Sequence, residues 1–289
     1  MILIIGAIVV IVCVFGGFLL EGGKLPVIIN AAVNESMIIV GGAVGSMIIM
    51  APKKILIDIG KGIGACLKGA PHSKASYEDL LKVLYELFLL GRRNGMIALE
   101  EHVLEPMKSS VMKKYPKFAA NHHAVEFLCS ALKPIIDGKI KPDQLRLLLD
   151  TQIDRMEQEH HAPMSVLQKT GDSMPGFGIV AAVLGIVITM ASINDGPEKI
   201  GEHVAAALVG TFLGILIAYG FMGPLATNME FVGEAELDYT KCIAACVNGF
   251  ANGMAPVTAV ELGRRGLSSE FRPSADELEA MFKGMKNAK

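Results

Sequence analysis

The fold is decided by residues 204–229, which read VAAALVGTFLGILIAYGFMGPLATNM. This stretch contains no acidic or basic side chain. A helix needs about 20 mainly apolar residues to cross the hydrocarbon core of a bilayer. We therefore predict a transmembrane helix here, long enough to tilt or to protrude beyond the bilayer.

Three further apolar runs predict three more spans. Residues 174–193 are free of charge, and so are residues 1–20, which lack the basic start and the cleavage site of a removable signal peptide. The shortest run, residues 36–52, lies between Glu35 and Lys53. Since 52% of the chain is hydrophobic, we expect an all-α membrane protein with four transmembrane helices.

The basic residues predict the orientation of these spans. Of the 27 Lys and Arg residues, 18 lie between spans two and three and seven follow span four. The connectors 21–35 and 194–203 hold one each. By the positive-inside rule, both chain ends and the large loop face the cytoplasm, while the two connectors face the periplasm.

The spans divide the chain into four parts. Residues 1–52 carry spans one and two with a short periplasmic loop, and residues 174–229 carry spans three and four, which are expected to line an ion path. Between them, residues 53–173 form a large helical cytoplasmic loop. Residues 230–289 form a cytoplasmic helical tail.

Composition and motifs exclude several classes of function. The net charge of -2 argues against nucleic acid as the main partner. The five cysteines lack the spacing of a disulfide framework or a zinc site. Phosphate-loop, dinucleotide and serine-hydrolase signatures are absent. The histidine pairs 122–123 and 160–161 lack a recognised metal spacing. We expect a protein that is not an enzyme and has no metal or cofactor.

Spans three and four contain no ionisable side chain, although such groups usually carry ions through membrane proteins. We therefore expect a membrane partner that supplies a carboxylate. Pro175 is expected to open span three in its first turn. Pro224 lies inside span four and frees the carbonyl of Gly220, unless it only adjusts the tilt of the helix.

Small residues recur along spans three and four, and such residues let helix backbones approach closely. They pack either the helices of one chain or those of neighbouring copies, and the sequence leaves both alternatives open. These residues are Gly178, Gly185, Ala206, Gly210, Gly214 and Ala218.

The large loop contains the pattern of a one-sided helix that ends in two arginines. Ser76 and Asp79 have the spacing of a helix-starting cap, and apolar residues follow at helical spacing toward Arg92. Gly95 is expected to weaken or bend this helix. If the helix continued, Arg92 and Glu100 would lie about 12 Å apart, too far for a direct pair. They would face either a partner's charges or solvent alone.

Four blocks of this sequence resemble the MotA family of flagellar stator proteins. Together the blocks cover essentially the whole chain, with the spans in the expected order. The blocks are SMPGFGIVAAVLG (173–185), the run from Ala207 to Pro224, GRRNGMIALEEH (91–102), and the tail NGMAPVTAVELGRR (252–265) with FRPSADELE (271–279).

The resemblance implies a homo-oligomeric ring of five subunits around two copies of MotB, in the bacterial inner membrane. MotB would supply the ion-binding aspartate, and the ring's cytoplasmic loops would push on FliG of the rotor. Arg92 and Glu100 match the loop charges that face FliG. Arg93 matches a variable position and Glu101 a position outside the motif, and both are included in the predicted contact. Phe271 departs from the many relatives that have an acid there.

The resemblance also implies an ion path. Pro175 and Pro224 match the family's paired prolines beside this path, and Thr211 matches its span-four hydroxyl. Ala182 aligns with a threonine of sodium-driven relatives, and span three has no hydroxyl between Pro175 and Thr189 that could bind sodium. We therefore predict a proton-driven stator.

Three rival functions remain at this point. An energiser of the ExbB or TolQ type resembles only part of the chain and has three spans. An autonomous channel or transporter would conduct ions without a partner. A passive membrane scaffold would tolerate charge changes at Arg92 and Glu100.

Overall fold

A computed structural model describes residues 2–69, 71–191 and 193–287, and this part of the chain contains helices but no strand. The chain forms two compact units. The first, here called the membrane unit, comprises Met1–Gly69 and Glu159–Val232. The second, here called the globular unit, comprises Ala70–Gln158 and Gly233–Lys289.

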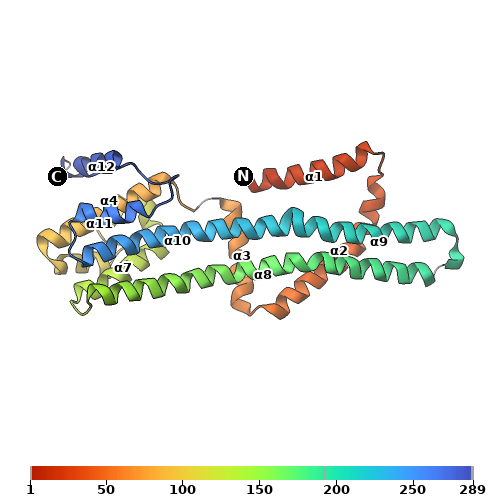
Figure 1. Ribbon diagram of the computed structural model, residues 1–289, viewed down its shortest axis with the longest axis horizontal. Helices are drawn as coiled ribbons and strands as arrows, with labels where there is room; N and C mark the ends of the chain where they lie inside the picture. Colours follow the sequence, from red (N-terminus) through yellow and green to blue (C-terminus); the bar gives the residue numbers. More distant parts are fainter. Residues whose placement is uncertain (1, 70, 192, 288–289) are drawn as a thin grey trace. The chain divides into compact units, whose positions relative to one another are not determined.

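In the part of the chain that the structure describes, four helices are long and apolar enough to cross a membrane: α1, α2, α8 and the continuous helix formed by α9, η4 and α10 (Figure 1). The helices with residues in the membrane unit are α1 (Ile2–Leu20), α2 (Leu25–Met50), α3 (Lys53–Lys68), α8 (Pro142–Ala191), η3 (Ile193–Asp195), α9 (Pro197–Ile217), the π-helical turn η4 (Ala218–Met222) and α10 (Gly223–Ala251).

Helix α2 begins well before the predicted run 36–52, at Leu25 with Pro26 in its first turn. The expected connector 21–35 is therefore mostly helical. A single acid in this apolar stretch does not end the helix, because the Glu35 side chain is buried inside the unit. The sequence had marked Glu35 as the border of span two, and this boundary was wrong.

Helix α8 runs without a break through Pro163 and Pro175. The expectation that Pro175 opens a helix is wrong, since α8 begins far upstream at Pro142. A proline inside a membrane helix removes one backbone hydrogen bond, and packing against a neighbouring helix can compensate for that loss. Here the neighbouring helix is α9, which lies beside α8 (Figure 1).

The membrane unit buries little of its apolar surface within one chain. One cluster joins α2, α8 and α9 through Ile39, Ala43, Ala181 and Leu213. Side chains on the outer faces of these helices stay exposed, and α1 has no buried residue at all, although its Phe15 ring meets Phe212 edge-on at 6.1 Å. Apolar surface of this extent indicates that lipid or further subunits cover the unit.

The globular unit has a continuous apolar core. Stacked rings mark it: Phe88 lies 4.4 Å from Phe250, and Tyr85 lies 4.0 Å from Phe282. Besides parts of α8 and α10, its helices are α4 (Lys74–Asn94), η1 (Met96–Leu99), α5 (Glu100–Leu104), η2 (Met112–Lys114), α6 (Pro116–Ala119), α7 (His122–Ile136), α11 (Pro256–Arg265) and α12 (Ala275–Asn287).

The cap of α4 lies three residues before the predicted one. The Ser73 hydroxyl accepts a hydrogen bond from the Ser76 N–H at 3.3 Å, and the Ser73 N–H donates to the Ser76 hydroxyl at 2.7 Å. Ser76 is therefore the third residue of the first turn, where it is buried, and its pairing with Asp79 as a cap was wrong. The helix ends at Asn94, because Gly95 has a φ of 88° that other residues rarely adopt.

Candidate functional site

Helices α8 and α9 are in backbone contact inside this chain. A Cβ built on Gly178 would lie 3.0 Å from the Gly210 carbonyl oxygen, and one built on Gly214 would lie 2.7 Å from the carbonyl oxygen of Met174. Only glycine leaves room for this approach. Gly185 meets the Ala207 side chain in the same way, at 2.9 Å.

The other predicted packing and path residues differ in how far they are buried. Ala218 is buried, whereas Ala206 is half-buried. Thr211 is half-buried, with its Cα 3.3 Å from the position of a Cβ on Gly178. Ala182 is half-buried beside the fully buried Ala181. The contact thus brings Thr211 and Gly178 together within one chain.

The two prolines lie next to irregular backbone. Pro175 has no N–H, so the carbonyl of Gly171 loses its helical donor. Gly171 itself packs on η4, with the Met222 Cβ 2.8 Å from where its own Cβ would be. Pro224 is the second residue of α10, which begins at Gly223 directly after η4, so the irregular backbone beside this proline is a π turn. The irregularities of α8 and of the α9–α10 helix therefore lie side by side.

Glu35 was not predicted as a site residue, yet it is the acid that α2 buries. Only 7% of its surface is exposed, and its Oε2 atom occupies the place where a Cβ of Gly210 would lie. Among the described residues, this oxygen has no hydrogen-bond partner. An ionisable group inside a membrane helix indicates a functional role by default. The signal available in the sequence was the apolar run 25–34 on the far side of the acid.

The predicted rotor-facing charges lie on two helices rather than one. Arg92 and Arg93 lie in the last turn of α4, whereas Glu100 and Glu101 begin α5 after Gly95 and the turn η1. All four side chains are exposed. The separation expected along one continuous helix therefore does not apply to Arg92 and Glu100.

These charges also have a local structural effect. Acids in a first turn and bases in a last turn favour the helix dipole, by about 0.3–1 kcal/mol each. Glu101 lies 3.4 Å from the Nε2 atom of His102, whose Nδ1 atom lies 2.9 Å from the Ser109 hydroxyl. The glutamates are thus presented by a segment whose buried histidine is held in place.

The histidine pairs of the sequence do not build a metal site in the described ranges. No three His, Cys, Asp or Glu side chains of residues 2–69, 71–191 and 193–287 come together as ligands.

Two family models match the chain. The model described as Motility protein A N-terminal matches residues 4–95, and that of the MotA/TolQ/ExbB proton channel family matches residues 119–237. Motility protein A of Escherichia coli (strain K12) is 37% identical over 99% of this chain and 97% of that protein. The chain belongs to the motility protein A family. Chemotaxis protein LafT of Vibrio parahaemolyticus is 34% identical over 95% of this chain and 96% of LafT.

Solved structures share the fold of this motility protein A family member. The structure titled C. jejuni MotAB matches with a TM-score of 0.77 at 22% identity, over 94% of this chain and 98% of that one. The flagellar MotAB stator complex from Bacillus subtilis matches with a TM-score of 0.73 at 23% identity, over 96% and 98% of the two chains.

The family match covers the site residues unevenly. Within this motility protein A family chain, Arg92 lies in the N-terminal match, and Pro175 and Pro224 lie in the second match. Glu100 lies between the two matched ranges. Its surroundings are therefore known from the structure of this chain rather than from the family models.

Proposed function

We propose that this chain is the ring subunit of a flagellar motor stator, which forms an ion channel with a MotB-like protein and drives the rotor. The observation that carries the proposal is the match of residues 4–95 to the motility protein A N-terminal model. An energiser of the ExbB or TolQ type would need only the shared channel model over residues 119–237. The likeness to the two MotAB structures supports the same function.

A MotB-like subunit supplies the carboxylate that binds the ion. In support, the apolar segments 174–191 and 204–217 carry no acidic or basic side chain. The acid of α2, Glu35, is turned against Gly210 inside the chain. The exposed apolar side chains of α1 and α8 suit a ring of copies in lipid, and we propose five around two MotB-like chains.

Ion binding is coupled to movement where α8 meets η4. A carboxylate that gains and loses charge changes the favoured shape of the wall around it. The contact of Gly171 with Met222 places the carbonyl freed by Pro175 beside the π turn before Pro224. Backbone that lacks regular helical bonds can change shape at less cost, so this contact is the proposed hinge.

The exposed charges at the end of α4 and the start of α5 contact the rotor protein FliG. We place both chain ends, the loop 53–173 and the tail 230–289 in the cytoplasm, and the segments 1–52 and 174–229 in the inner membrane. The distribution of Lys and Arg supports this topology. The topology puts Arg92, Arg93, Glu100 and Glu101 on the side of the membrane where the rotor lies.

Expression with a cognate MotB-like protein in cells that lack their own stator tests this function. We expect the tagged chain to co-purify with that protein and to restore swimming. A chain that inserts into the membrane, fails to retain the MotB-like protein and leaves the cells non-motile would contradict the proposal. Ion flux from the chain alone would instead favour an autonomous channel.

A further inference from the structure

The turn between the rotor-facing arginines and glutamates presents an apolar side chain to solvent. Gly95 ends α4, and the turn η1 (Met96–Leu99) follows. Leu99 is fully buried, and its Cδ1 atom lies 2.8 Å from where a Cβ of Gly91 would be. Because Leu99 fixes one end of this short turn, Ile97 points outward, with 79% of its surface exposed.

Ile97 borders a surface hollow of about 550 Å³. Leu90, Ala98 and Leu104 contribute apolar atoms to its lining, and Leu104 is 58% exposed. Glu100 and Glu101 line the same hollow. A partner that covers this exposed apolar side chain and the adjoining hollow would exclude water from both, as happens at the centre of an interface.

The charges around Ile97 are arranged by sign along the chain. Arg92 and Arg93 precede it in the last turn of α4, and Glu100 and Glu101 follow it in the first turn of α5. This order complements a helix that carries an apolar residue between an acid and a base. Charged rims set orientation and association rate, whereas buried apolar anchors provide most of the binding energy.

We propose that Ile97 is an apolar anchor of the rotor contact, which inserts between apolar side chains of a FliG helix while that helix fills the adjoining hollow. The proposal rests on the proposed stator function and adds a contact that charge alone does not supply. Salt screens exposed charges beyond about 8 Å at physiological ionic strength, whereas an apolar contact is not weakened in this way. The anchor thus keeps the rotor engaged when charge steering is weak.

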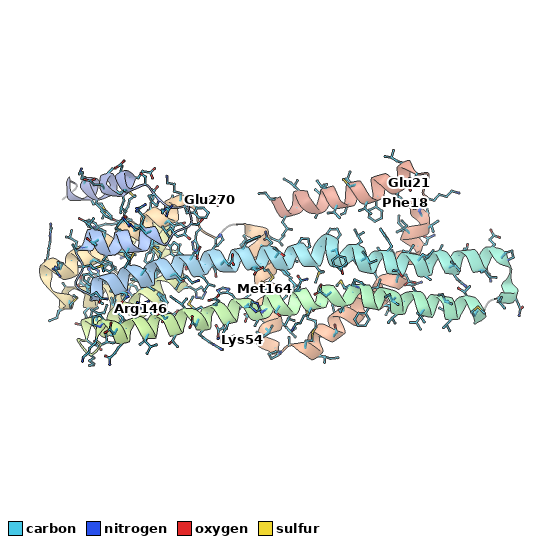
Figure 2. The ribbon with its side chains drawn as sticks, in the orientation of Figure 1. Phe18, Glu21, Lys54, Arg146, Met164 and Glu270 are labelled. Atoms are coloured by element: carbon cyan, nitrogen blue, oxygen red, sulfur yellow. The ribbon has the colours of Figure 1, made fainter. Side chains whose placement is uncertain are left out.

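Torque per stator in the full complex with its MotB-like partner tests the anchor. We expect Ile97→Ser to weaken rotor engagement about five-fold, seen as lower torque per stator and fewer stators at each motor. Ile97→Leu should retain both. Leu147→Ser is the matched control, because Leu147 is 70% exposed in the same unit and directly follows Arg146, which Figure 2 labels. This control should behave as the unchanged chain.

Full torque and normal recruitment with Ile97→Ser overturns the anchor. So does an equal loss with Leu147→Ser, since that result reports a general effect of polar substitution on the globular unit. Membrane levels of each variant and retention of the MotB-like protein are measured alongside, because only a loss of torque at normal assembly supports the anchor. If the unchanged chain fails to rotate the motor at all, the proposed function fails rather than the anchor.

Discussion

The Glu35 carboxylate of α2 occupies the space above the Gly210 Cα of α9, where any other residue would place its Cβ. The small residue that lets α8 and α9 approach thus also makes room for a buried acid from a third helix. Gly210 therefore serves two neighbours, because the Ala181 side chain lies 3.2 Å from the same position.

Gly210→Ala should destabilise the membrane unit. The new methyl group displaces the Glu35 carboxylate, and overpacking of this kind costs about 1–3 kcal/mol. Thermal unfolding of the purified complex measures the loss. Gly201→Ala on the same helix is the control, because its Cβ meets nothing within 4 Å. Adding Glu35→Ala should recover part of the loss, and equal stability of the Gly210 and Gly201 variants would refute this packing.

The globular unit should loosen in acid because of His72. This buried ring stacks on Tyr239 at 4.1 Å, and burial lowers the pKa of His72 to about 4. The folded pKa lies below the unfolded value of 6.5, so the fold favours the neutral ring. Stability therefore falls as pH drops below about 6.5, by up to roughly 2–3 kcal/mol near pH 4.

Hydrogen exchange of α4 in the intact complex at pH 7.5 and pH 5 tests this acid sensitivity. His72→Phe keeps an aromatic stack without a titrating group, so we expect its exchange to change less between the two pH values. His123→Phe is the control, since His123 is exposed at the start of α7. An unchanged pH response in the His72 variant would show that another group is responsible.

Replacing either proline should stop rotation without preventing assembly. Pro175→Ala returns a hydrogen-bond donor to the Gly171 carbonyl, and Pro224→Ala returns one to the Gly220 carbonyl. Each substitution makes the helix at the proposed hinge more regular. Swimming and co-purification with the MotB-like protein are scored together. Pro163→Ala, at the other internal proline of α8 and eight residues before Gly171, is the control. Normal swimming with both Pro175 and Pro224 replaced would end the hinge proposal.

Reversing one rotor-facing charge should impair rotation more than assembly. Arg92→Glu or Glu100→Lys opposes the partner's charge, and such effects depend on sign and ionic strength. A reversed charge on FliG should restore torque. Arg146→Glu is the control, because Arg146 is also exposed and lies 3.6 Å from Asp150. Loss of membrane insertion in the Arg92 or Glu100 variants would instead assign them a structural role.

The motor should run on protons. Sodium needs several oxygen ligands in place of water, and Thr211 is the hydroxyl that span four offers beside Gly178. Span three has Ala182 where a second hydroxyl would help. Rotation speed should follow the proton-motive force and persist when sodium is removed at constant membrane potential. Motors that stop without sodium and restart with it would reverse this assignment.

The sequence predicted those features that depend on local pattern. Charge-free length identified the apolar helices, although not the start of α2. The four glycines of the predicted packing set lie where α8 and α9 touch, while packing between copies stays a prediction. The sequence missed what depends on distant partners. The sequence alone places Glu35 at the end of a span, because the side chain packs against Gly210, which is far away in the sequence. Ser73 and Ser76 form the cap of α4, three residues before the predicted cap. The prediction missed it because several spacings of serines and acids fit the start of this helix.

The π turn η4 has a geometrical effect on everything that follows it. An α-helix turns by about 100° per residue, so the 11 residues from the buried Leu213 to Pro224 make almost three full turns. In an uninterrupted α-helix the two side chains would therefore lie on the same face. A π turn contains one residue more than an α-helical turn. The faces of the helix after η4 are therefore rotated by roughly 100° relative to an uninterrupted α-helix. Pro224 is accordingly exposed, whereas Leu213 is buried. A one-residue deletion between 218 and 222 would swing the proline onto the inner face, so the phase of this helix matters as much as its composition.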